Sequence, residues 1–176
     1  MMEIDLNAAN EVGRIENLKK YKILYTAPEP IFDQLAAIAA TMLDAPVAMI
    51  NFVDGDKVWT KANQNGESGM EVERNTSLCS LAILNDKVTV FDDLQKQVST
   101  ISNPMVAGES GFRFYAAAPI TTDEGFNVGS VCVVDRTSRE FNIEEQNKLE
   151  WVAVLVRKEM NKRIENKRMI GSAVPA

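Results

Sequence analysis

Two cysteines, Cys79 and Cys132, are the most nucleophilic side chains of this chain, and no histidine accompanies them. The absence of histidine excludes a Ser-His-Asp triad, a Cys-His nucleophile pair, a histidine-ligated haem and a histidine-containing zinc site. It also removes the imidazole that acts as a pH switch or accepts a phosphoryl group. The cysteines lie too far apart in sequence to indicate a metal cluster or a disulfide framework. Cys132 lies within the apolar stretch VCVV, where a buried, inert thiol is the usual case.

Pairs of adjacent carboxylates, such as Asp92-Asp93 and Glu144-Glu145, are other groups suited to acid-base or metal chemistry. Asp92-Asp93 follows an expected strand, where such residues more often cap the next turn. Glu144-Glu145 falls in the first turn of an expected helix, where negative charge complements the helix dipole. We interpret both pairs as structural, so we nominate no catalytic or metal-binding residue.

Length and charge limit the class of protein further. The 176 residues fit one domain with its own core, because domains hold about 100–200 residues. The net charge of -6 argues against nucleic-acid binding, which needs clustered Lys and Arg. The first ten residues carry Glu3 and Asp5 and lack the pattern of a signal peptide, and no window approaches the ~18 apolar residues of a membrane span. We therefore expect a cytoplasmic protein with reduced thiols and no membrane insertion.

The spacing of apolar residues predicts helices near both ends of the chain. One helix is expected over 11–22 and a core-facing helix over 29–43, in which Pro30 suits the first turn. Asn142 is placed to cap a long amphipathic helix that runs to about residue 169. The expected apolar stripes are Val12, Ile15, Leu18 and Tyr21; then Ile31, Leu35, Ile38, Ala39 and Met42; then Ile143, Leu149, Val152, Leu155 or Val156, and Ile164.

Runs rich in β-branched and aromatic residues predict strands between these helices, over 47–54, 57–62, 87–91, 112–120 and 128–135. A short helix is expected over 78–84, a loop over 63–73 and a long excursion over 94–110. Tight turns at Asp54-Gly55 and at 123–125 require antiparallel neighbours, because parallel strands need a longer crossover. The fold class is therefore α+β, with one antiparallel sheet and helices largely on one face.

Six segments, in order along the chain, resemble those of a GAF domain. They are YKILYTAPEPIFDQLAAIAA (21–40), AMINFVDGDKVWTKA (48–62), SLCSLAI (77–83), NPMVAG (103–108), FRFYAAAPI (112–120) and GSVCVVD (129–135). The likeness is to the subgroup found at the N-terminus of bacterial sensor histidine kinases and diguanylate cyclases. It implies a central antiparallel sheet with N- and C-terminal helices packed on one face, and short helices and loops that roof a pocket on the other. It further implies an N-terminal extension over 1–13, the GAF domain over 14–158, and the end of a signalling-type helix and a tail over 159–176.

The resemblance also nominates pocket residues, on the sheet face away from the terminal helices. Matched motif by motif, they are Trp59, Cys79, Phe91, Asp92, Arg113, Tyr115 and Asp135, with Asn103 and Met105 in the roof. Aromatic walls with few convergent polar groups are typical of a small-ligand pocket. Arg113 offers a forked donor for a carboxylate or phosphate, or alternatively pairs with Asp92 or Asp93 and pins the roof. We interpret Trp59 and Phe91 as core or wall residues rather than specific contacts.

Several departures from the family pattern reduce the polar groups available to a ligand. Relatives that bind bilins attach the pigment to a cysteine followed by histidine, whereas Ser80 follows Cys79 here, so we expect no bilin and no other cofactor. Leu81 stands where the subgroup commonly has a histidine, and KQVSTI (96–101) replaces its acidic-then-Arg-Phe segment. The Asn-Lys-Phe-Asp-Glu set of cyclic-nucleotide-binding relatives is not found. A degenerate or apolar pocket is therefore an alternative to a ligand-binding one.

One enzymatic branch of the family, the free methionine-R-sulfoxide reductases, uses pocket cysteines as nucleophile and resolver. Cys79 and Cys132 could take these roles, but the cysteines of that branch lie in different motifs. We therefore expect a non-enzymatic protein, with this reductase as the alternative.

The terminal helices suggest how such a module assembles. In the family these helices pair across a two-fold axis and pass signals to an output domain. The resemblance thus implies a homodimer through Val12, Ile15, Leu18, Val152, Leu155 and Val156; alternatively, these residues cover the back of the sheet. Altogether the sequence predicts a small-molecule-sensing, dimeric module of bacterial signal transduction that acts on an output domain or partner protein. A purely structural dimerisation domain remains a second alternative.

Overall fold

The computed structural model describes residues 10–64, 68–96 and 111–173, with side chains as far as residue 165. Its centre is a six-stranded sheet in the order β3-β2-β1-β6-β5-β4, in which every neighbouring pair is antiparallel. The strands are β1 (Val47–Val53), β2 (Lys57–Asn63), β3 (Glu71–Glu73), β4 (Thr89–Phe91), β5 (Phe114–Thr121) and β6 (Asn127–Asp135). The α+β class expected from the sequence is confirmed.

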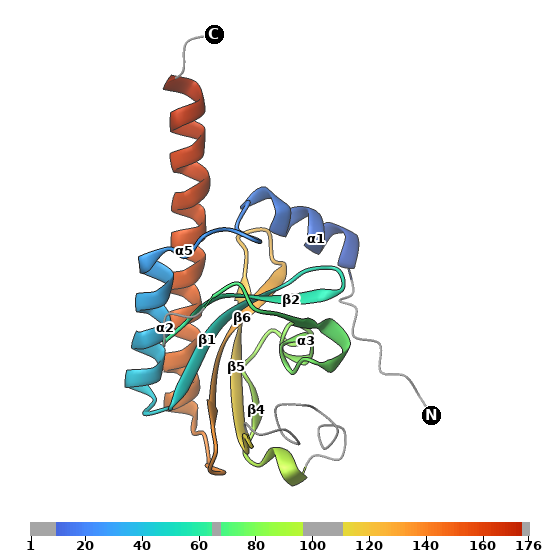
Figure 1. The fold of residues 1–176 in the computed structure, drawn as a ribbon, viewed down its shortest axis with the longest axis vertical. Helices are drawn as coiled ribbons and strands as arrows, with labels where there is room; N and C mark the ends of the chain where they lie inside the picture. Colours follow the sequence, from blue (N-terminus) through green and yellow to red (C-terminus); the bar gives the residue numbers. More distant parts are fainter. Residues whose placement is uncertain (1–9, 65–67, 97–110, 174–176) are drawn as a thin grey trace.

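The helices lie on both sides of this sheet. They are α1 (Glu11–Lys20), α2 (Pro30–Met42), α3 (Cys79–Ala82) and α5 (Ile143–Ala173), with single 3-10 turns at Arg74–Thr76 and Leu94–Lys96. Figure 1 shows α2 and α5 side by side against one face, α3 on the opposite side, and α5 continuing well past the sheet. The expected cap of α5 is present, because Asn142 Oδ1 accepts the backbone N–H of Glu145 at 2.8 Å and Glu145 Oε1 accepts that of Asn142 at 3.2 Å.

Alternation along the strands divides the core into two parts. On β1, Ala48, Ile50 and Phe52 point toward α2 and α5, where they join the larger apolar cluster. Met49 and Val53 belong instead to smaller clusters on the α3 side. Both faces of the sheet are therefore buried, which is why the strand reads as one continuous apolar run in the sequence.

The buried side of α2 differs from the expected stripe. Ile31 and Ile38 are 36% and 38% exposed, whereas Phe32, Ala36 and Ala39 are buried. The small alanine side chains let the helix backbone approach the sheet closely, and close packing favours that side over the bulkier isoleucines. The segment 63–73, expected as a loop, also contains the exposed edge strand β3, whose two glutamates suit an unpaired sheet edge.

A charged cluster ties α1 to the β1–β2 hairpin. Arg14 is 1% exposed, and its Nη1 donates to the carbonyl oxygen of Val53 at 2.7 Å. Its guanidinium also forms two hydrogen bonds with the Glu11 carboxylate, which pairs in addition with Arg74. Burying this arginine turns Val12, which was expected in the apolar stripe, outward to 73% exposure.

Glu11 is expected to make the protein sensitive to acid. Burial raises the pKa of its carboxyl, but hydrogen bonds from Arg14 and Arg74 outweigh this and lower the pKa from 4.5 to about 2. The ionised carboxylate therefore stabilises the fold above pH 4.5, and this stability is lost as the pH falls toward 2. At pH 7, Glu11→Gln should lower the free energy of unfolding by about 2 kcal/mol, after allowance for partial solvent screening.

Denaturant unfolding at several pH values measures this effect. The difference between the wild-type protein and Glu11→Gln should shrink between pH 4.5 and pH 2. Glu16→Gln, on the exposed side of α1, serves as the control and should follow the wild type. A constant difference across the acid range would show that the Glu11 charge does not carry the effect.

Candidate functional site

The candidate site lies on the sheet face opposite α5, where α3 covers the middle strands. Cys79, the first residue of α3, meets Cys132 of β6 there, although the two are distant in sequence. Asn51 of β1 lies between them, and its Nδ2 is 3.2 Å from the Cys79 sulfur and 3.6 Å from the Cys132 sulfur. Tyr115 of β5 donates its hydroxyl to the Cys79 sulfur at 3.5 Å.

A further hydrogen bond fixes the orientation of the Asn51 side chain. Thr60 Oγ1 donates to Asn51 Oδ1 at 2.7 Å, so the Asn51 amino group must point toward the sulfurs. Asn51 and Thr60 are 3% and 9% exposed, and Ser130, which faces Asn51 across the β1–β6 pair, is fully buried. The site is thus a buried polar cluster in an otherwise apolar layer.

The two thiols differ in their acidity. The pKa of Cys79 is lowered from 9.0 to about 6, chiefly by the hydrogen bond from Cys132; burial opposes the shift and the Tyr115 hydroxyl adds to it. The pKa of Cys132 is raised well above its usual value, because it is the donor in that hydrogen bond and is buried beside the charge on Cys79. Burial and the neighbouring Cys79 also raise the pKa of Tyr115, which therefore remains a donor. Cys79 is therefore the more acidic thiol of the pair.

Apolar walls surround this polar cluster. The rings of Phe91 and Tyr115 lie 6.2 Å apart between their centroids, on the adjacent strands β4 and β5. The remaining wall residues come from α3, β5, β6 and the segments beside them; they are Leu78, Ala82, Leu94, Phe112, Ala117 and Val134. Aromatic and aliphatic side chains thus enclose the few polar groups of the cluster.

Arg113 lies at the margin of this layer and already has a partner. Its Nε donates to Asp93 Oδ1 at 3.1 Å, and its Nη2 pairs with the other oxygen of the same carboxylate. This hydrogen bond from Arg113 lowers the pKa of Asp93. The structure therefore contains the pairing with Asp93 that the sequence left as one of two alternatives. Asp92 is exposed, and its carbonyl oxygen accepts the backbone N–H of Arg139.

Two further nominated residues, Trp59 and Asp135, also lie outside the cluster. Trp59 pairs across the sheet with Phe52, so it lies on the helix-covered face, where its ring is 5.8 Å from that of Tyr25. Asp135 pairs with Phe114 at the end of β6, and its carboxylate accepts hydrogen bonds from Thr137 in the following turn. These placements correct the expectation, because alternation along a strand sends neighbouring residues to opposite faces. Asn103 and Met105 lie outside the described residues.

The cluster also contains three polar residues that the sequence did not nominate: Asn51, Thr60 and Ser130. It contains Cys132 as well, for which the sequence predicts an inert, buried thiol. A signal for two of them is present, since Asn51 and Ser130 are single polar residues inside the apolar runs VAMINFV and GSVCVV. A polar side chain in a buried strand needs a hydrogen-bonding partner. A polar residue within an apolar run therefore indicates a buried polar site, but it does not identify the residues that hydrogen-bond to it.

The structure buries three of the six candidate dimer residues and leaves the other three at least partly exposed. Leu18, Val152 and Val156 are fully buried in the core against the sheet, so they cannot contact a second copy in this fold. Val12 is 73% exposed, and Ile15 and Leu155 are partly buried. Among the described large apolar residues of α5, Trp151 is the most exposed after Ile143, at 50%. The alternative, that the apolar stripe covers the back of the sheet, holds for the buried three.

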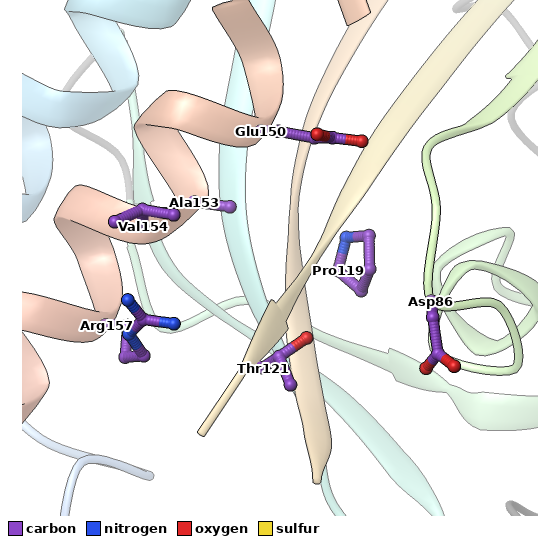
Figure 2. Close-up of a pocket in the computed structure, with 7 residues that line it drawn as sticks. All are labelled: Asp86, Pro119, Thr121, Glu150, Ala153, Val154 and Arg157. Carbon is purple, nitrogen blue, oxygen red and sulfur yellow. The ribbon is translucent and has the colours of Figure 1, made fainter. Parts of the chain in front are cut away.

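A separate pocket lies beside the edge of β5 and is drawn in Figure 2. Residues of α5, of the end of β5 and of the segment before β4 line it: Asp86, Pro119, Thr121, Glu150, Ala153, Val154 and Arg157. Its volume of about 160 Å³ is below the roughly 300–1,000 Å³ of small-molecule sites. The polar cluster beneath α3 therefore remains the candidate site. Among the described helices, none combines the length and the apolar character needed to cross a bilayer.

Comparisons with known proteins agree with this architecture. The family model described as GAF domain matches residues 27–159. A cyclic di-GMP phosphodiesterase from Pseudomonas aeruginosa is 35% identical over 130 residues, which are 74% of this chain but only 22% of that protein. The chain thus spans about a fifth of the length of this relative.

Solved structures share the fold at low sequence identity. The GAF domain of PixJ from Thermosynechococcus elongatus superimposes with a TM-score of 0.64 at 13% identity, covering 90% of this chain and 94% of that one. A type II free methionine-R-sulfoxide reductase from Thermoplasma acidophilum gives a TM-score of 0.58 at 16% identity, covering 74% and 92%. These likenesses concern the fold alone.

Proposed function

Because the chain belongs to the GAF family, we propose that it is a non-enzymatic regulatory module of signal transduction. In this proposal a small molecule binds beneath α3, and the terminal helices form a homodimer that carries the signal. The observation that supports it most is the buried cluster of Asn51, Cys79 and Tyr115. These side chains present donors and acceptors inside an apolar layer, which is the composition of a small-molecule site.

A domain that processes cyclic di-GMP is the output we propose for this module. The relative from Pseudomonas aeruginosa is named as a cyclic di-GMP phosphodiesterase, and this chain matches only a part of it. Such an output domain could belong to the same polypeptide or to a partner protein. The module would then control turnover of the cyclic dinucleotide without performing it.

Ligand binding is tested by a thermal-shift screen of metabolites. A ligand at 100 times its dissociation constant stabilises a protein by about 2.7 kcal/mol, which raises the melting temperature of a domain this size by roughly 5–10 °C. Tyr115→Phe should weaken the shift, because it removes the hydroxyl beside Cys79. Tyr25→Phe makes the same change on the other side of the sheet and should leave the shift intact. The absence of any shift would favour the structural dimerisation domain with a degenerate pocket.

Dimerisation is proposed to use the outward side of α5. Trp151 is 50% exposed there, and Leu155 follows one turn later. Trp151→Glu should convert a dimer to a monomer, because a charge replaces the apolar centre of the contact. Met70→Glu, at an exposed apolar residue beside β3, is the matched control and should remain dimeric. Light scattering at micromolar concentration measures the mass; a monomeric wild-type protein would contradict the dimer.

A reductase of free methionine sulfoxide is the second candidate, and the position of Cys79 and Cys132 around one amide nitrogen, Asn51 Nδ2, favours it. The test supplies free methionine sulfoxide and a thiol reductant to the purified protein. Under the regulatory proposal we expect no turnover. Turnover that disappears in Cys79→Ser would establish the enzymatic function instead.

A further inference from the structure

Cys79 and Cys132 lie close to a single side-chain amide in the layer beneath α3. One amide nitrogen, Asn51 Nδ2, lies 3.2 Å from the Cys79 sulfur and 3.6 Å from the Cys132 sulfur, so both thiols share one hydrogen-bond donor. The two elements that carry them, α3 and β6, pack directly against each other. Both cysteines are free thiols in the structure.

The surroundings distinguish the two sulfurs. Cys79 receives hydrogen bonds from Asn51 and Tyr115, which stabilise negative charge on its sulfur. Cys79 keeps 5% exposure, whereas Cys132 has none. Cys79, the more acidic thiol, is thus also the less completely buried of the two. Susceptibility to oxidation follows thiolate character, which these hydrogen bonds favour at Cys79.

We propose that Cys79 and Cys132 are a redox-modification site, at which a hydroperoxide such as hydrogen peroxide converts the two thiols into a reversible disulfide. This inference does not depend on the ligand or on the regulatory function proposed above. It assigns Cys79 as the residue oxidised first and Cys132 as the resolving residue. Asn51 and Tyr115 act as positioning residues.

The chemistry proceeds in two balanced steps. The Cys79 thiolate attacks one peroxide oxygen, the O–O bond breaks, and the leaving hydroxide takes up a proton to become water; Cys79 is then a sulfenic acid. The Cys132 sulfur next attacks the Cys79 sulfur, forming the S–S bond and breaking the S–O bond. The thiol proton of Cys132 leaves with the hydroxyl as a second water. Overall, the two thiols lose two electrons and the peroxide gains them.

The disulfide would change the layer beneath α3. Asn51 contacts both sulfurs in the reduced protein, so a direct S–S bond alters both of its contacts. It would also link α3 covalently to β6 and thereby fix the helix over the candidate site. Reduction by a dithiol restores the original arrangement by thiol–disulfide exchange.

The experiment treats the purified, reduced full chain with stoichiometric hydrogen peroxide and follows intact mass and free thiols. We expect the loss of two hydrogen atoms, the disappearance of both thiols, and a peptide map that joins Cys79 to Cys132. Dithiothreitol should reverse all three changes. In Cys132→Ser, dimedone should trap a sulfenic acid at Cys79, whereas Cys79→Ser should react far more slowly.

The pH profile separates a reactive pair from incidental oxidation. The rate should reach half its maximum near pH 6, following the pKa of about 6 of Cys79, and not near the roughly 8.5 of an ordinary thiol. Tyr115→Phe should move this midpoint upward, whereas Tyr25→Phe should not. A peptide map of the wild type with no Cys79–Cys132 link, or with links only between chains, would overturn the proposal without any variant. Metabolite binding is measured separately, so failure of one proposal leaves the other intact.

Discussion

Gly129→Ala is expected to be among the most destabilising substitutions in the sheet, lowering the free energy of unfolding by about 3 kcal/mol. Gly129 lies on β6 directly opposite Phe52 of β1. A Cβ atom at this position would overlap the carbonyl oxygen of Asn51 and lie 3.1 Å from Cα of Phe52. Both atoms belong to the backbone of the central strand pair, so they cannot rotate away. The strands must separate, which weakens the β1–β6 hydrogen bonds.

Chemical denaturation with circular dichroism measures this effect, and Gly55→Ala provides the control. Gly55 is in the turn between β1 and β2, and a Cβ added there meets nothing within 4 Å. Its variant should differ from the wild type by less than about 0.5 kcal/mol. Similar stabilities for the two variants would show that the central strands can shift without cost. Since Asn51 also bridges the thiols, Gly129→Ala should in addition slow the oxidation of Cys79.

Glu29→Gln is the second substitution with a large expected effect, again about 3 kcal/mol, because it leaves a buried ammonium without its carboxylate. Lys61 of β2 is fully buried and pairs with Glu29 just before α2. Its Nζ also donates to Thr26 Oγ1 and to the Ala27 carbonyl, each at 2.8 Å. Arg163 of α5 binds the same carboxylate at 3.1 Å, so the variant leaves two cations facing each other.

The pH dependence of the stability of Glu29→Gln tests whether the unpaired charge of Lys61 causes the loss. Burial already lowers the pKa of Lys61 in the wild type, and loss of Glu29 lowers it further. The unfolded state then binds more protons than the folded state, so the variant should regain stability as the pH rises toward the unfolded pKa of about 10.4. Denaturant unfolding between pH 7 and pH 10 tests this. A variant whose deficit is constant over that range would indicate a packing effect instead.

Two further variants sharpen the interpretation. Lys61→Met in the Glu29→Gln background removes the stranded charge and should recover much of the stability, which makes the double-mutant coupling large. Glu73→Gln removes the partner of Lys57 on the neighbouring strand pair, where both side chains are partly exposed, and should leave the unfolding midpoint unchanged. The contrast matters for function, because Glu29 joins β2 to α5, the helix proposed to carry the signal.

The sequence determined the main elements of this fold through local rules. The Asp54-Gly55 turn predicted the hairpin between β1 and β2, and the structure has it. Asn142 predicted the start of α5, because its side chain satisfies a backbone group of the helix only a few residues away. Such signals act between neighbours in the chain. They can therefore be recognised in the sequence without knowing which residues pack across the sheet.

Which face each strand residue occupies was decided by the tertiary structure. Both faces of this sheet are buried, so apolar residues follow one another without a polar side to mark the outside. Trp59, which the family resemblance nominated for the pocket face, lies against Tyr25 on the helix-covered face. The irregularity in the β1–β2 pairing between Ile50 and Asn51 also shifts the register, and sequence alternation does not reveal it.

The chemistry of the thiols shows the same division. The sequence established that Cys79 and Cys132 have no histidine beside them, and this excluded several enzyme classes. Only the packing of α3 over β6 places the two sulfurs together, with Asn51 between them. Asn51 thus brings together residues far apart in the chain, and a pattern along the chain carries no information about such a distance. Local sequence thus fixed the elements, and the burial of both sheet faces decided which side chains meet.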